Sequence, residues 1–170
     1  VTSTVMMVEA LQAFGGLAEP YIPDRLEEGY GLNNEALTNL KESGVQVVLS
    51  VDCGIRSVVE ARHALDLGLD LIITDHHHIG EQLPPGYAVI DPKRDGDAYP
   101  DKNLAGVGVA YTLVPALASR RPGSGISAEY LLALVALGTI ACLVPLIAEN
   151  RHFVRQGLHR LPLDHLPRAL

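Results

Sequence analysis

The chain has 170 residues, with 13 basic and 20 acidic side chains and a formal net charge of −7. Its apolar share of 48% and charged share of 19% exclude a predominantly disordered protein. The acidic balance excludes a broad cationic surface that would hold a nucleic-acid backbone, although residues 151–170 carry four Arg against one Asp. Two cysteines far apart in the sequence make no zinc pattern and favour a reducing, cytoplasmic compartment.

The first predicted element is a helix that begins at Thr2-Ser3-Thr4 and ends at Gly15-Gly16. No targeting peptide precedes it, and an element without any lead-in suggests that an upstream part of the protein is missing. A second helix is expected over residues 33–43, with an Asn cap and a glycine stop.

A strand–helix–strand pattern follows. Residues 46–51 and 69–74 are β-branched apolar runs that predict buried strands, and residues 55–67 between them have helical spacing. Residues 87–90 predict a third strand. Such units have parallel strands and a right-handed crossover. The pattern therefore predicts an α/β fold with a doubly wound, mostly parallel sheet, helices on both faces and its first strand missing.

Two further apolar helices are expected over residues 105–119 and 128–141. Residues 130–148 contain no charge and approach the length of a membrane-spanning helix. Gly138, Thr139 and Pro145 interrupt this run and no basic cluster flanks it, so we expect a buried helix leading into a loop and no membrane span.

Acid and histidine side chains follow the first two predicted strands. Asp52 follows one strand and Asp75-His76-His77 follows the next, so both groups reach the same edge of the sheet. Carboxylate with imidazole suits Mn²⁺, Mg²⁺ or Fe²⁺, and also zinc. The alternatives are a turn or cap role for Asp52 and a solvated loop for the histidines. Cys53 is interpreted as a small buried residue rather than a nucleophile.

Two other segments are candidates for phosphate binding. The polar loop over residues 21–33 carries Arg25, which could hold a phosphate bidentately or form an exposed salt bridge. Gly106 and Gly108 lie at a predicted helix start, where free backbone N–H groups can meet an anion. The third glycine and the preceding strand of a dinucleotide fingerprint are absent.

Together these segments resemble the DHH phosphoesterase superfamily, most closely its RecJ family of single-stranded-DNA-specific exonucleases. The similarity follows nearly the whole chain in order, through residues 1–4, 21–33, 51–54, 74–77, 91–94, 104–110, 137–141 and 145–151. It implies a metal-dependent phosphodiesterase that removes nucleotides from single-stranded DNA, 5′ to 3′, in repair and recombination.

The resemblance also implies roles for individual residues. Asp52 would bridge two divalent ions, Mn²⁺ or Mg²⁺, and His76 would be a ligand of one of them. Asp75 would orient the His76 imidazole as its hydrogen-bond support. His77 would contact the scissile phosphate, and Arg25 would hold a phosphate. In the two-metal scheme both ions stabilise the charge that develops during in-line displacement.

Three departures from the family pattern bear on activity. The family's Asp-x-Asp-Gly segment is absent because the chain begins after it. Cys142 occupies the position of a family aspartate, and its thiol is a poor ligand for Mn²⁺ or Mg²⁺ but could favour zinc. The family's C-terminal domain is also absent. We therefore expect a truncated DHH domain over residues 1–150, the start of a helical linker over 151–170, and no DNA degradation by these 170 residues alone.

Two other functions remain open. One is a DHH phosphodiesterase of short oligonucleotides or cyclic dinucleotides. The loop 21–33 and the segment 104–110 favour the exonuclease over this alternative, because both are associated with the RecJ family. The other is a catalytically impaired DHH domain that binds DNA or a replication partner, for which Cys142 is the support.

Overall fold

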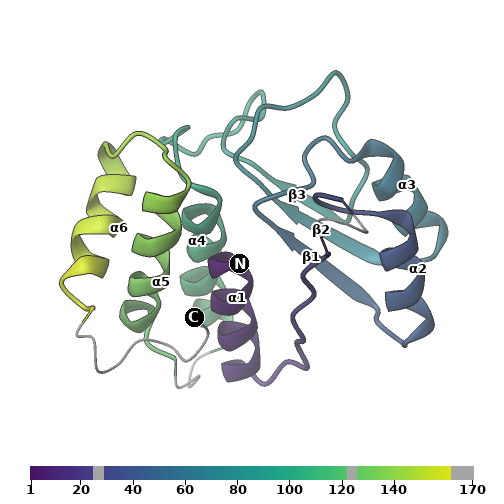
Figure 1. Cartoon of the computed structure of the whole chain (residues 1–170), viewed down its shortest axis with the longest axis horizontal. Helices are drawn as coiled ribbons and strands as arrows, with labels where there is room; N and C mark the ends of the chain where they lie inside the picture. The colour runs from purple at the N-terminus through teal and green to yellow at the C-terminus, as the bar shows by residue number, and fades with distance from the viewer. Residues whose placement is uncertain (25–28, 122–125, 162–170) are drawn as a thin grey trace. The chain divides into compact units, whose positions relative to one another are not determined.

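The computed structural model describes residues 1–24, 29–121 and 126–161, which form two compact units. One unit comprises residues 22–102, and the other combines residues 1–21 with the segment from 103 onward. Within these described ranges, the three strands belong to the first unit and four helices belong to the second (Figure 1).

The strands of unit 22–102 form one parallel sheet in the order β1-β2-β3. They are β1 (Val47–Val51), β2 (Asp70–Thr74) and β3 (Ala88–Ile90). Helix α3 (Val58–Asp66) connects β1 to β2 as the crossover that the sequence predicts. The parallel α/β fold is therefore confirmed, with each strand within one residue of its predicted start.

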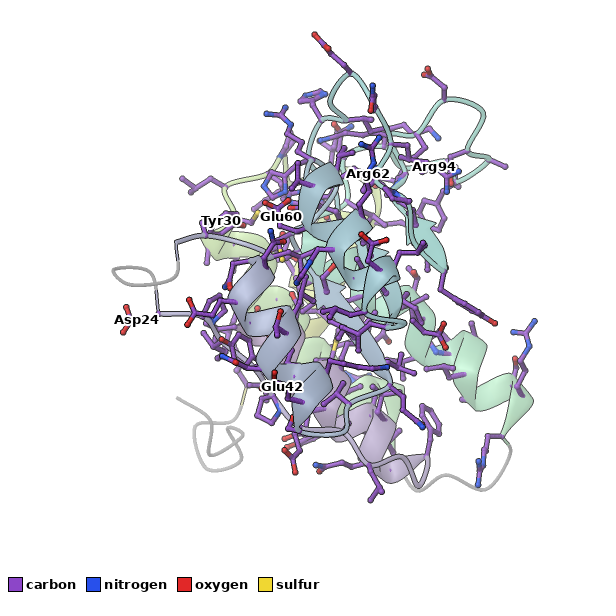
Figure 2. All side chains as sticks on the ribbon, turned by 90° about the vertical axis from the view of Figure 1, so that its right-hand side faces the viewer. Asp24, Tyr30, Glu42, Glu60, Arg62 and Arg94 are labelled. Atoms are coloured by element: carbon purple, nitrogen blue, oxygen red, sulfur yellow. The ribbon has the colours of Figure 1, made fainter. Side chains whose placement is uncertain are left out.

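Helices α2 (Asn34–Glu42) and α3 lie on the same side of this sheet (Figure 1). The Asn33 side chain caps α2 by accepting the Ala36 N–H at 2.7 Å. Charged residues such as Glu42 and Arg62 are exposed on these helices (Figure 2). The apolar residues form a buried cluster with β2, made of Leu37, Ala61, Ala64, Leu69, Leu71 and Ile73. Burying this cluster holds the strands in the register that the site requires.

The second unit contains α1 (Thr2–Ala13), α4 (Gly106–Arg120), α5 (Ala128–Ala141) and α6 (Ala148–Leu158). Helices α5 and α6 approach closely because Gly157 has no side chain: a Cβ there would lie 2.2 Å from the Leu132 carbonyl oxygen. Asn150, fully buried in α6, accepts the Ala105 N–H at 3.1 Å and donates to the Asn103 carbonyl at 2.6 Å. Asn150 therefore fixes the start of α4 against α6.

The expected buried helix over residues 128–141 is found with those bounds. Among the residues that the structure describes, no helix is both long and apolar enough to cross a membrane. The helix predicted to begin at Ile55 begins instead at Val58, because residues 52–57 form the loop that carries the candidate site. The predicted boundary at residue 150 lies within α6 and stays a prediction, and residues 162–170 lie outside the described part.

Candidate metal centre

Three aspartates stand at the carboxyl ends of the three strands. In the sheet, Val51 pairs with Thr74 and Thr74 pairs with Ile90. The next residue in each strand's chain is an aspartate: Asp52, Asp75 and Asp91. The register therefore places three acidic residues side by side at the edge where open parallel sheets bind ligands.

Asp52 has a left-handed backbone conformation, with φ of 65°. Its N–H donates to the Thr74 carbonyl at 2.9 Å, and its own carbonyl accepts the Tyr30 hydroxyl at 3.1 Å. Tyr30 belongs to the polar loop that the sequence singled out (Figure 2). Such a conformation costs about 1–3 kcal/mol in a non-glycine residue and persists where the surroundings enforce it, often at functional sites.

The turn after Asp52 requires glycine at position 54. Gly54 has a φ of 109°, and a Cβ there would lie 3.0 Å from Ser50 Oγ and 3.2 Å from Ile73 Cγ2. We expect Gly54→Ala to lower the free energy of unfolding by about 2 kcal/mol or more, measured by urea denaturation. Gly96→Ala is the control, because Gly96 also has positive φ but open space around its α-carbon. Equal losses in both variants would show that crowding at Gly54 adds nothing.

Asp75 is a buried hydrogen-bond acceptor at the end of β2, only 1% exposed. Its Oδ2 accepts the Ile55 N–H at 2.9 Å. Its Oδ1 accepts the N–H groups of His76 at 2.7 Å and His77 at 3.2 Å, and lies 2.6 Å from Nδ1 of the His77 ring. A carboxylate oxygen accepts hydrogen bonds, so Oδ1 of Asp75 can also accept from Nδ1 of the His77 ring when that nitrogen carries a hydrogen.

The family resemblance implies that Asp75 orients the His76 imidazole. In the structure, the imidazole that contacts Asp75 is that of His77, while Asp75 contacts His76 through the backbone N–H. The reason is local: an aspartate side chain folded over the next turn reaches the second residue after it. The His77 side chain is 48% exposed, so a ligand or substrate can reach its ring.

His76 lies beside Asp52. Its side chain is 7% exposed, and its Nε2 lies 3.2 Å from Asp52 Oδ1. That Oδ1 is buried and forms no hydrogen bond within the described part of the chain. Two ligands bound to one cation at ~2.1 Å and at right angles lie ~3 Å apart. A buried carboxylate oxygen without a hydrogen bond, next to an imidazole nitrogen, therefore fits a divalent cation.

A second group of possible metal ligands shares Asp52 with the pair of Asp52 and His76. Ligand atoms of Asp52, Asp75 and His77 all lie within 4.8 Å of one another. The structure thus brings together all four strand-end residues that the sequence singled out, across one βαβ unit. Their individual roles stay predictions.

Asp91 was given no role from the sequence. It is fully buried, its Oδ1 accepts the Lys93 N–H at 2.8 Å, and burial raises the pKa of its carboxyl. The proximity of Asp75 also raises this pKa, while the Lys93 N–H lowers it. The available signal was positional, because Asp91 follows its strand as Asp52 and Asp75 follow theirs.

Two further residues, Cys53 and His78, lie next to the candidate metal ligands in the sequence. Burial, with the charges of Asp75 and Asp52, raises the pKa of the Cys53 thiol to about 11, which disfavours a nucleophilic role. His78 is exposed, and its carbonyl accepts the Arg56 Nε–H at 2.7 Å. Arg25 lies outside the described residues.

Two predicted roles fall in the helical unit. Gly106 and Gly108 lie in the first turn of α4, and both are buried. A Cβ on Gly108 would lie 3.1 Å from Leu104 Cδ2, so close packing accounts for this glycine, and phosphate binding stays a prediction. Cys142 is the C-cap residue that follows α5, and its role also stays a prediction.

Comparison with known proteins decides the family. Residues 1–139 match the model of the DHH family, N-terminal domain. The chain belongs to the DHH family. It is 49% identical over 161 residues to the single-stranded-DNA-specific exonuclease RecJ of Bacillus subtilis (strain 168), covering 95% of this chain and 20% of that protein. It is 41% identical over 170 residues to RecJ of Escherichia coli (strain K12), covering 94% of this chain and 30% of that protein.

Two solved structures share the fold of this chain. The crystal structure of exonuclease RecJ bound to manganese matches with a TM-score of 0.83 and 40% identity, covering 95% of this chain and 40% of that one. RecJ of Thermus thermophilus in complex with Mn²⁺ matches with a TM-score of 0.76 and 34% identity, covering 95% of this chain and 22% of that one. This chain therefore spans only a part of each relative's length.

Proposed function

We propose that this chain is the DHH portion of a metal-dependent exonuclease that hydrolyses single-stranded DNA from its 5′ end. The observation that carries the proposal is the pairing of Asp52 Oδ1 with His76 Nε2 at 3.2 Å, at the aligned ends of two parallel strands. Support comes from the similarity to RecJ proteins whose structures contain manganese.

Asp52 and His76 would hold a divalent cation, proposed as Mn²⁺ or Mg²⁺, with Asp52 able to bridge two ions. Such a cation supplies Lewis acidity toward a phosphoryl oxygen. Cys142 departs from the hard ligands that these ions prefer and would shift the preference toward zinc.

His77 would act on the scissile phosphate. The contact of Asp75 Oδ1 with His77 Nδ1 at 2.6 Å would orient the ring, with Nε2 placed to contact a phosphate oxygen. The three N–H groups that Asp75 accepts fix the loop and thereby the position of this ring. Arg25 and the amides at Gly106 and Gly108 are proposed as further phosphate contacts.

The remaining proposals concern the whole protein. We propose a DHH domain over residues 1–150, the start of a linker over 151–170, further domains of the same protein that complete the DNA-binding groove, and a cytoplasmic location. Roles in DNA repair and recombination follow from the same proposal.

The test is degradation of 5′-labelled and 3′-labelled single-stranded DNA by the intact protein with Mn²⁺. We expect His77→Ala to lower the rate about a hundredfold or more, the loss typical of removing one donor to a developing charge. His78→Ala should leave the rate within about twofold, because His78 is exposed beyond the site.

Three outcomes would contradict the proposal. Equal losses in the two variants would remove His77 from the chemistry. Release of label from the 3′ end first would reverse the polarity. Faster hydrolysis of a dinucleotide or cyclic dinucleotide than of a long strand would favour the small-substrate phosphodiesterase.

A further inference from the structure

Lys93 connects the end of the third strand to the backbone of His76. Its Nζ lies 2.5 Å from the His76 carbonyl oxygen. A hydrogen bond from an ammonium group is charge-assisted and about twice as strong as one between neutral groups. Lys93 is half-buried, which limits competition from water.

The turn after β3 fixes the position of Lys93. Oδ1 of the buried Asp91 accepts the Lys93 N–H at 2.8 Å, and the Asp91 carbonyl accepts the Arg94 N–H at 3.1 Å. The Arg94 guanidinium also donates to the Val89 carbonyl. Several hydrogen bonds therefore close the turn from which Lys93 reaches His76.

Both polar backbone groups of His76 are consequently held. Its N–H donates to Asp75 Oδ1 at 2.7 Å, and its carbonyl accepts from Lys93. The Asp75 N–H in turn donates to the Ile90 carbonyl at 3.0 Å, which joins β2 and β3 next to these bonds. Fixing the backbone on both sides sets the point from which the His76 ring reaches Asp52, and the burial of the side chain restricts the ring itself.

We infer that Asp91 and Lys93 are positioning residues for the metal-binding histidine, and we call this pair the third-strand brace. The inference rests on the proposed function, because it assumes that His76 holds a cation. One carboxylate oxygen of Asp91 is buried without a hydrogen bond in the described part of the chain, which costs folding free energy. Stability alone does not explain an acid at this position.

The test measures Mn²⁺ binding to the intact protein by calorimetry, and amide hydrogen exchange at residues 76–78 without metal. Lys93→Met should raise the Mn²⁺ dissociation constant about tenfold, within the range for groups that support a metal ligand, and should speed exchange at these amides. Lys93→Arg should restore both values, because its guanidinium can still donate. Lys102→Met is the matched control, since Lys102 is an exposed lysine whose ammonium group contacts Asp97 rather than the backbone of His76.

Unchanged affinity and unchanged exchange in Lys93→Met would overturn the inference, and so would equal effects in Lys102→Met. If Lys93→Met does not fold, Lys93→Leu is measured in the same way, because leucine likewise has no hydrogen-bond donor in its side chain. If His76→Ala leaves Mn²⁺ affinity unchanged, the proposed metal site fails. Amide exchange in the metal-free protein still tests the third-strand brace in that case: exchange in Lys93→Met as slow as in the unsubstituted protein would contradict the inference.

Discussion

Replacing His76 with alanine is expected to lower the affinity of the intact protein for Mn²⁺ about a hundredfold or more. The variant removes an imidazole nitrogen that lies 3.2 Å from a buried carboxylate oxygen without a hydrogen bond. Losing a group that only supports a ligand costs about 10–100-fold, and losing the ligand itself should cost at least the upper value. Asp52→Asn should have a similar effect, because it removes the charge from the other member of the pair.

The control for His76 is its neighbour two residues along the chain. His78→Ala should change the Mn²⁺ dissociation constant by less than about twofold, because His78 is exposed and its contact with Arg56 is made by the backbone carbonyl, which the variant keeps. Calorimetric titration of the three variants decides the assignment. A loss in His78→Ala as large as that in His76→Ala would overturn it.

Replacing Asp75 with alanine is expected to lower the free energy of unfolding by about 3–5 kcal/mol. The carboxylate is 1% exposed and accepts three backbone N–H groups as well as the His77 ring. Each buried donor left without an acceptor costs about 1–3 kcal/mol, reduced where water can enter. Denaturant unfolding monitored by circular dichroism measures the change.

Two further variants separate the possible causes of that loss. Asp75→Asn should cost about 2 kcal/mol, because one amide oxygen can still accept at Oδ1 while the amide NH₂ faces the Ile55 N–H. Asp70→Ala, at the exposed start of the same strand, should change stability by less than about 0.5 kcal/mol. A loss in Asp75→Ala below about 1 kcal/mol would show that the hydrogen bonds of Asp75 do not hold this loop.

The position of the site was predictable because it depends on the order of the strands and on the alternation of strand and helix along the chain. Buried β-branched runs separated by a helical segment fix a parallel pair of strands, and a parallel pair brings its carboxyl ends together. Asp52 and His76 could therefore be placed at one sheet edge from the sequence. The bounds of β1 and β2 follow from the same pattern.

The contacts within the site were not predictable in the same way. The left-handed φ of Asp52 and the choice of His77 rather than His76 as the ring partner of Asp75 depend on the path of individual loops. The bond from Lys93 to the His76 carbonyl joins residues of different strand ends, and no local periodicity encodes it. The position of Asp91 at this sheet edge could have been predicted, because the strand-end rule applies to β3 as it does to β1 and β2.

Anomalous diffraction at the manganese edge, from crystals of the intact protein grown with Mn²⁺, tests the central claim most directly. The proposed function predicts a peak within ~2.3 Å of both an Asp52 carboxylate oxygen and His76 Nε2, the distance of a direct ligand. The same peak should be absent in crystals of His76→Ala. A peak bound by neither residue, or one that survives His76→Ala unchanged, would contradict the assignment of this strand-end pair as the metal site.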